Sequence, residues 1–289
     1  MKAAVCEICP HACKLAPGQL GLCKARVGAE RVLSMDTPAV EIYVRDQSFG
    51  RITSIALDPI EKKPLARFMP GSKVVSVGSY GCNMRCAFCQ NSSIACAGED
   101  DVSWRFMSPG ELVDIALQTR KQGNVGIAYT YNEPFVSYEF MLETAKLAHD
   151  AWLVNVVVTN GMVNPEPLAQ ILPYIDAANV DLKAFDHESY RKLGGDLDCV
   201  RATIRAMAEC PSCHVEVTTL VVPGFNDDPE QIEGAAKWIA SLSPEIPYHL
   251  SRFFPCHKMR DRKPTDVDFI YRMAELCRTH LKHVYTGNC

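Results

Sequence analysis

Between Ser79 and Asn91 the chain reads Ser79-Tyr80-Gly81-Cys82-Asn83-Met84-Arg85-Cys86-Ala87-Phe88-Cys89-Gln90-Asn91. The three cysteines have the spacing C-x3-C-x2-C, and they follow the apolar segment 73–78, which predicts a β-strand. A [4Fe–4S] cluster normally takes four cysteines, so three would leave one iron without a protein ligand. The alternatives are a zinc knuckle or three structural thiols, but the paired C-x2-C halves of a zinc ribbon are missing from this stretch. An open metal position is typical of catalytic sites, so Cys82, Cys86 and Cys89 predict a reactive [4Fe–4S] cluster.

Length and composition predict a globular protein with a sizeable core. The chain has 289 residues, a length at which α/β barrels commonly form one domain. Its hydrophobic share of 47% and charged share of 22% are ordinary for such a protein. The formal net charge is −4, and Lys and Arg are not interleaved with aromatic residues in any run, so nucleic acid is not an expected partner.

Targeting and cysteine usage favour a reducing compartment. The N-terminus has no apolar segment of signal-peptide length. The longest apolar run, 152–159, is far shorter than the ~20 residues that a membrane span needs. We therefore expect a cytoplasmic protein with no membrane partner, in which the 14 cysteines serve metal binding rather than disulfides.

Three parts of the chain differ in pattern. Residues 1–30 are rich in Cys, Gly and Pro and show little apolar periodicity, so we expect a metal to order them. Residues 31–72 predict short strands at 40–44 and 51–57 and then a loop with two prolines. From 73 to 289 strands and helices alternate, which predicts an α/β fold with a parallel sheet, open or curled into a partial (β/α)6 barrel.

The alternation in this third part is regular enough to place its elements. Strands are predicted at 74–79, 126–131, 155–159, 177–182, 214–222, 247–253 and 283–286. Helices are predicted near 137–150, 165–172, 228–241 and 266–281, and the clearest helix begins at the capping box Ser108-Pro109-Gly110-Glu111. In barrels, ligands gather at the carboxyl ends of the strands, so the chemistry is expected there.

Polar residues follow several of these strands. Glu133 comes after the second strand, Thr159-Asn160 ends the third, and Asp181-Leu182-Lys183 ends the fourth. Each of them also fits an ordinary turn or a surface ion pair, which carries little information by itself. Their common position after strands favours a shared binding site next to the cysteines.

Four further cysteines lie near the N-terminus: Cys6, Cys9, Cys13 and Cys23. Their spacing, C-x2-C-x3-C-x9-C, suits a tetrahedral zinc site and equally an auxiliary iron–sulfur cluster. Unligated surface thiols are the third reading of a segment with so little core. The spacing predicts a second metal site, with zinc and iron–sulfur both open.

The motifs occur in an order that resembles the radical S-adenosylmethionine (SAM) superfamily. The N-terminal cysteines, the segment 58–65, Cys-Gln-Asn, Tyr-Asn-Glu-Pro and Val-Asp-Leu-Lys follow one another as in the AmmeMemoRadiSam-system enzymes, relatives of pyruvate formate-lyase activating enzyme. Relatives carry Gly-Gly-Glu-Pro where this chain has Tyr131-Asn132-Glu133-Pro134. The resemblance implies that SAM is bound by Phe88, Asn91, Asn132, Glu133, Thr159, Asn160, Asp181, Lys183, Val222, Gly224 and His249. For His249, a satisfied core histidine is an equal alternative.

The resemblance also implies a reaction. A reduced cluster would split SAM into methionine and a 5′-deoxyadenosyl radical, which takes a hydrogen atom from a protein, peptide or small-molecule substrate. A glycyl-radical enzyme activase is one alternative, and a non-enzymatic iron–sulfur electron carrier or zinc-binding interaction module is another. A flavodoxin- or ferredoxin-like electron donor is the implied partner.

Overall fold

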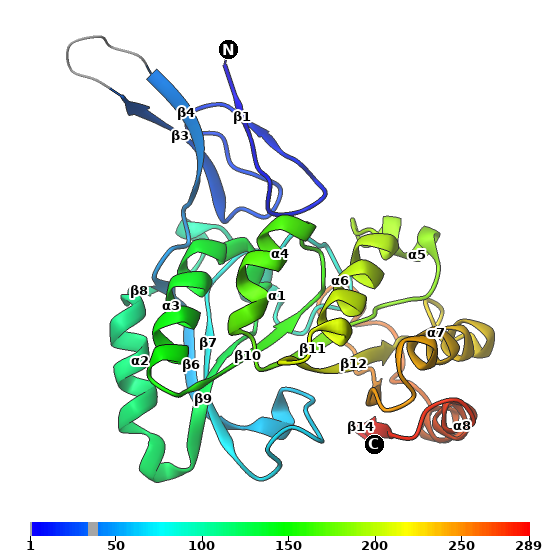
Figure 1. Ribbon diagram of the computed structural model, residues 1–289. Helices are drawn as coiled ribbons and strands as arrows, with labels where there is room; N and C mark the ends of the chain where they lie inside the picture. Colours follow the sequence, from blue (N-terminus) through cyan, green and yellow to red (C-terminus); the bar gives the residue numbers. More distant parts are fainter. Residues whose placement is uncertain (1, 34–39) are drawn as a thin grey trace.

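The computed structural model describes residues 2–33 and 40–289, and it is built around one curled sheet of eight strands (Figure 1). The strand order is β14-β13-β12-β11-β10-β9-β7-β6. The bounds are β6 (Ser54–Pro59), β7 (Lys73–Gly78), β9 (Asn124–Tyr129), β10 (Val154–Thr159), β11 (Ala177–Asp181), β12 (His214–Val221), β13 (Tyr248–Arg252) and β14 (Val284–Gly287). Neighbouring strands are parallel, except that β6 pairs antiparallel with β7. The predicted α/β partial barrel is confirmed.

Helices connect the parallel strands and cover the outer face of the sheet (Figure 1). Their bounds are α1 (Ser92–Ala95), α2 (Pro109–Gln118), α3 (Tyr138–Asp150), α4 (Pro165–Ile171), α5 (His187–Lys192), α6 (Leu197–Glu209), α7 (Pro229–Leu242) and α8 (Val267–Arg278). Short 3-10 turns are η1 (Ile60–Lys62), η2 (Glu99–Asp101), η3 (Arg120–Gln122), η4 (Pro134–Ser137) and η5 (Leu172–Tyr174). At the start of α2 the predicted capping box is present, because Ser108 and Glu111 each accept the other's backbone N–H.

The N-terminal part lies at one end of the barrel (Figure 1). It contains β1 (Ala4–Val5) paired with β2 (Lys14–Leu15), and the hairpin of β3 (Arg26–Val32) with β4 (Val40–Asp46). Next to it, β5 (Arg51–Ile52) pairs with β8 (Arg105–Phe106). The predicted strands at 40–44 and 51–57 lie within β4 and within β5 and β6, while residues 34–39 of the same part are outside the described residues. The divisions 1–30, 31–72 and 73–289 stay a prediction, although β3 begins inside the first and pairs with β4 in the second.

The sheet positions a site at one edge because parallel strands present their carboxyl ends together. The strands have few polar interruptions, and Val74, Val156, Val180 and Val217 are completely buried. Among the described residues, no helix is long and apolar enough to cross a membrane.

Candidate functional site

A cavity of about 720 Å³ opens at the carboxyl edge of the sheet. We call Cys82, Cys86 and Cys89 the triad, and all three line this cavity. Most of the predicted SAM-binding residues line it as well: Phe88, Asn91, Asn132, Glu133, Thr159, Asn160, Asp181, Lys183 and His249. Val222 and Gly224 are not among the lining residues, and their proposed contact with SAM stays a prediction.

The triad lies on the loop after β7, where burial controls the state of its thiols. Burial raises the pKa of Cys86 to about 11, although the nearby Lys183 ammonium lowers it. Burial also raises the pKa of Cys82 well above its ordinary value, and the Glu133 carboxylate adds to this shift. Without a metal these thiols are therefore protonated, and a metal must displace their protons to bind.

The donor set of the triad fits a [4Fe–4S] cluster. Three sulfur ligands face one cavity, and thiolates are the ligands that iron–sulfur clusters take in proteins. In the part of the chain that the structure describes, no three His, Cys, Asp or Glu side chains are placed to hold one metal ion together. A cube makes no such demand, because each cysteine binds a different iron.

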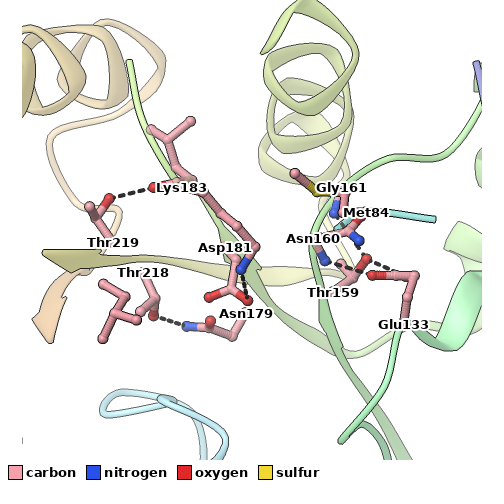
Figure 2. Close-up of polar contacts among 12 residues, drawn as sticks. Met84, Glu133, Thr159, Asn160, Gly161, Asn179, Asp181, Lys183, Thr218 and Thr219 are labelled. Carbon is pink, nitrogen blue, oxygen red and sulfur yellow. Dashed lines mark hydrogen bonds and ion pairs between the residues drawn. The ribbon is translucent and has the colours of Figure 1, made fainter. Parts of the chain in front are cut away.

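Glu133 is buried, lines the same cavity as the triad and is held by three donors, of which Figure 2 shows Thr159 and Asn160. Its carboxylate accepts from Thr159 Oγ1 at 2.7 Å, from Asn160 N at 2.8 Å and from Phe135 N at 3.1 Å. Burial raises the pKa of Glu133 to about 7, against the opposing effect of these donors. A carboxylate fixed in this way is oriented to receive a cationic group from the cavity.

Asp181 and Lys183 form an ion pair after β11 (Figure 2). Lys183 Nζ lies 2.9 Å from Asp181 Oδ2. Burial alone would lower the pKa of Lys183, but Asp181 and Cys86 outweigh it and hold that pKa above its ordinary value. The lysine is therefore a permanent cation next to the triad, suited to an anionic cluster or a carboxylate.

Tyr131 and Asn132 fasten the triad loop at both ends. Asn132 accepts from Ser79 N at 2.9 Å and donates to the carbonyls of Tyr80 and Gly81, each at 3.0 Å. The carbonyl of Tyr131 accepts from Asn91 Nδ2 at 2.7 Å. Tyr131 has a φ of 71°, a strained conformation that such surrounding contacts must maintain. Asn132 and Asn91 therefore position the loop, a role that the sequence pattern did not predict.

Another part of the cavity wall contains a buried ion pair that the sequence analysis did not predict. Lys63 is 3% exposed, lines the cavity, and places Nζ 2.9 Å from Asp58 Oδ2. Tyr131 donates its hydroxyl to the same oxygen at 2.7 Å, and its ring lies 4.8 Å from the ammonium. Burial lowers the pKa of Lys63, while the Asp58 carboxylate opposes that shift. In the sequence both residues lie in the segment 58–65, which contributed only to the motif order.

His249 reaches the cavity from β13 and also has a partner in the interior. It donates through Nε2 to Glu216, a fully buried carboxylate on β12. Glu216 also accepts from His214 at 2.9 Å, from Ala66 N at 3.0 Å and from Arg67 N at 2.8 Å. His249 therefore lines the cavity and has a buried partner for Nε2, and its contact with SAM stays a prediction.

We call Cys6, Cys9, Cys13 and Cys23 the quartet, and these cysteines line a second, smaller cavity. The sulfurs of Cys13 and Cys23 both lie close to Gly21, since a Cβ on that glycine would be 3.8 Å from the first and 3.7 Å from the second. The loop after β10 holds this segment, since Asn164 donates to the carbonyls of Ile8 at 2.8 Å and Glu7 at 2.6 Å. The four predicted ligands thus line one cavity, but no three of them are placed to hold one metal ion together.

Comparison with known proteins identifies one family and several relatives, one of which spans nearly the whole chain. The radical SAM superfamily matches residues 76–239. "Uncharacterized protein MJ0808" of Methanocaldococcus jannaschii is 38% identical over 286 residues, which cover 98% of this chain and 80% of that protein. The isethionate sulfite-lyase activating enzyme of Oleidesulfovibrio alaskensis is 28% identical over 201 residues, which cover 66% of this chain and 63% of that enzyme.

One solved structure shows the same fold over most of the chain. It is a radical SAM methyltransferase from Sphaerobacter thermophilus, with a TM-score of 0.56 and 18% sequence identity. The match covers 91% of this chain and 77% of that one. At this identity the likeness concerns the fold alone.

Proposed function

Because the chain belongs to the radical SAM superfamily, we propose that it cleaves SAM at a [4Fe–4S] cluster on the triad and takes a hydrogen atom from a protein partner. The observation that carries the proposal is the cavity at the strand ends, which joins three thiols to a ring of polar side chains. Three protein ligands leave one iron free for the substrate to bind. When bound, the cluster supplies the electron that breaks the sulfonium bond of SAM.

The side chains of the ring divide the task of holding SAM. Glu133 receives the ammonium of the methionine part, because its carboxylate is buried and oriented by Thr159 and Asn160. Lys183 balances negative charge beside the triad, and Asp181 fixes the direction of that cation. Phe88 packs against Phe225 with ring centroids 5.3 Å apart and offers an apolar surface to the adenine.

For the substrate we propose a backbone Cα–H of a partner enzyme, the target of glycyl-radical activases. The support is the isethionate sulfite-lyase activating enzyme, whose name states that it activates another enzyme. We further propose, from the motif order, that the chain belongs to the AmmeMemoRadiSam-system group and that a flavodoxin- or ferredoxin-like protein donates the electron. We also propose that the quartet binds a metal, as its spacing and shared cavity suggest.

The test begins with the anaerobically reconstituted protein, dithionite and SAM. We expect 5′-deoxyadenosine to form, and its absence with an intact cluster would overturn the assignment of the reaction. The partner step uses a co-expressed candidate enzyme with deuterium at the glycine Cα. Transfer of deuterium into 5′-deoxyadenosine and a glycyl EPR signal support the activase, whereas transfer from a small molecule alone contradicts it.

A further inference from the structure

The quartet is placed against a buried cation. Arg26 lines the same cavity, is 4% exposed, and binds Glu139 through two contacts of 2.7 and 2.6 Å. A guanidinium does not lose its proton in proteins, so the charge is permanent. Metal bound to four thiolates carries excess negative charge, which a fixed cation on the cavity wall stabilises.

The quartet also touches the triad through the backbone. Cys82 N donates to the carbonyl of Cys23 at 3.2 Å, which links one ligand of each group by a single hydrogen bond. Gly81 makes this approach possible: its φ is +85°, and a Cβ there would lie only 2.3 Å from the same carbonyl oxygen. The two groups are therefore held together by the chain itself.

A second bridge runs through Asn83, which lines the quartet's cavity. The ring of His11 lies 2.8 Å from the Asn83 carbonyl. The side chain of Asn83 accepts from Asn160 Nδ2 at 2.9 Å, and that same nitrogen is 3.6 Å from Cys82 Sγ. A polar network thus connects the wall of the quartet's cavity to Asn160 and Cys82 in the wall of the large cavity.

On its other side the quartet faces the surface. Leu22 lines the quartet's cavity and is 49% exposed, while Leu20 is 46% exposed. An external protein can approach the quartet here while SAM and substrate occupy the large cavity over the triad. The quartet therefore lies between a surface that a donor can reach and the site that needs the electron.

From these contacts we infer that the quartet holds an iron–sulfur cluster that relays electrons to the triad's cluster across the Cys23–Cys82 contact. A low-potential flavin or iron–sulfur protein loses one electron to the quartet. The quartet's cluster then returns to its oxidised state as the triad's cluster is reduced. Zinc has no redox chemistry and would make the quartet a structural site only. The inference rests on the proposed function for its final electron acceptor.

The metal is identified in the full chain carrying Cys82→Ala, Cys86→Ala and Cys89→Ala. After anaerobic reconstitution we expect about four irons per chain and an EPR signal on reduction, from the quartet alone. Because one hydrogen bond joins Cys23 to Cys82, we expect two reduced clusters in the unaltered chain to broaden each other's signals. Zinc without iron in the triple variant, or a wild-type spectrum that is the plain sum of two isolated signals, overturns the relay.

Electron transfer is tested by counting product after the reductant is removed. We expect the fully reduced chain to form about two 5′-deoxyadenosines on addition of SAM, and a Cys9→Ser/Cys13→Ser variant about one, because each cube stores one electron. Cys210→Ser is the matched control and should behave like the unaltered chain. One product from the unaltered chain, with the quartet's signal left unconsumed, contradicts the relay, whereas no product from any chain contradicts the proposed function instead.

A quartet variant that does not fold still leaves the inference testable. The triple variant supplies the EPR spectrum of the quartet's cluster. With that spectrum known, the decay of the quartet's signal can be followed in the unaltered chain during SAM cleavage. Loss of that signal in step with the second product supports the relay, and a persistent signal refutes it.

Discussion

The triad and the quartet are both cysteine groups, yet they are built by different parts of the fold. The triad follows a buried barrel strand, and residues far apart in the chain surround it, such as Lys63, Glu133 and Lys183. The quartet lies in a segment whose described residues before Arg26 form only the two-residue strands β1 and β2. Its surroundings include the fixed cation of Arg26, Asn83 and the backbone of the triad loop.

This difference distinguishes two uses of cysteine thiolates as metal ligands. Three thiols facing a large polar cavity leave room for a substrate to bind a metal. Four thiols lining a small cavity satisfy a metal completely, which suits electron transfer or structural support. The number of thiols and the size of the space in front of them, rather than cysteine itself, indicate which group does chemistry.

The largest expected effect comes from the Cys82→Ala/Cys86→Ala/Cys89→Ala variant. SAM cleavage should fall to background, because no other described group offers a cluster with an open iron at the cavity. The loss of SAM cleavage is measured as 5′-deoxyadenosine formed with dithionite as the reductant. A quartet variant should retain cleavage with that reductant. Equal losses in both variants would erase the functional distinction between the two groups.

Lys63→Met should lower the free energy of unfolding by about 3 kcal/mol, since removing one partner of a buried ion pair leaves a buried charge uncompensated. Asp58 would keep only Tyr131 and the exposed Lys62. Denaturant unfolding measures the change. Lys62→Met is the matched control and should cost less than about 0.5 kcal/mol, so similar losses in both variants would refute the role assigned to Lys63.

Glu133→Gln should lower the rate of SAM cleavage about 10- to 100-fold, because a hydrogen bond to a charged group contributes about 1.5–3 kcal/mol. Iron content should not change, as Glu133 is not a ligand. The exposed Glu166→Gln serves as the control. Cleavage at the wild-type rate in Glu133→Gln would show that this carboxylate does not take part in binding SAM.

Much of the barrel could be predicted, because its strands are local apolar runs with short connections. The strand predicted at 155–159 is β10 (Val154–Thr159), and the one at 214–222 is β12 (His214–Val221). Helices α5 and α6 were missed, although their N-caps Asp186 and Asp196 were visible in the sequence.

The tertiary contacts of Glu216 and Tyr131 had no local signal in the sequence. Glu216 binds the amides of Ala66 and Arg67, which are about 150 residues away in the chain. Tyr131 adopts a positive φ that neither its residue type nor its neighbours indicate. Such positions depend on tertiary contacts, whereas the cysteines and strand-end residues of the site were visible as a motif.

The last prediction concerns Glu216 and is measured at acid pH. Burial alone would raise the pKa of this carboxyl, but His214, His249 and two amides lower it to about 2 from its ordinary 4.5. A lowered pKa contributes stability that is complete above about pH 4.5 and is lost as the pH falls toward about 2. Glu216→Gln should flatten this acid branch in thermal unfolding, and an unchanged branch would show that other groups cause it.

The separation of roles is tested by electron–nuclear double resonance of the reduced protein with SAM labelled by ¹⁵N in its amino group. We predict coupling between that nitrogen and the cluster in the unaltered chain and in the Cys9→Ser/Cys13→Ser variant, and none in the triad variant. Coupling that persists without the triad, or that is missing while the triad's cluster is intact, would contradict the assignment of SAM binding to Cys82, Cys86 and Cys89.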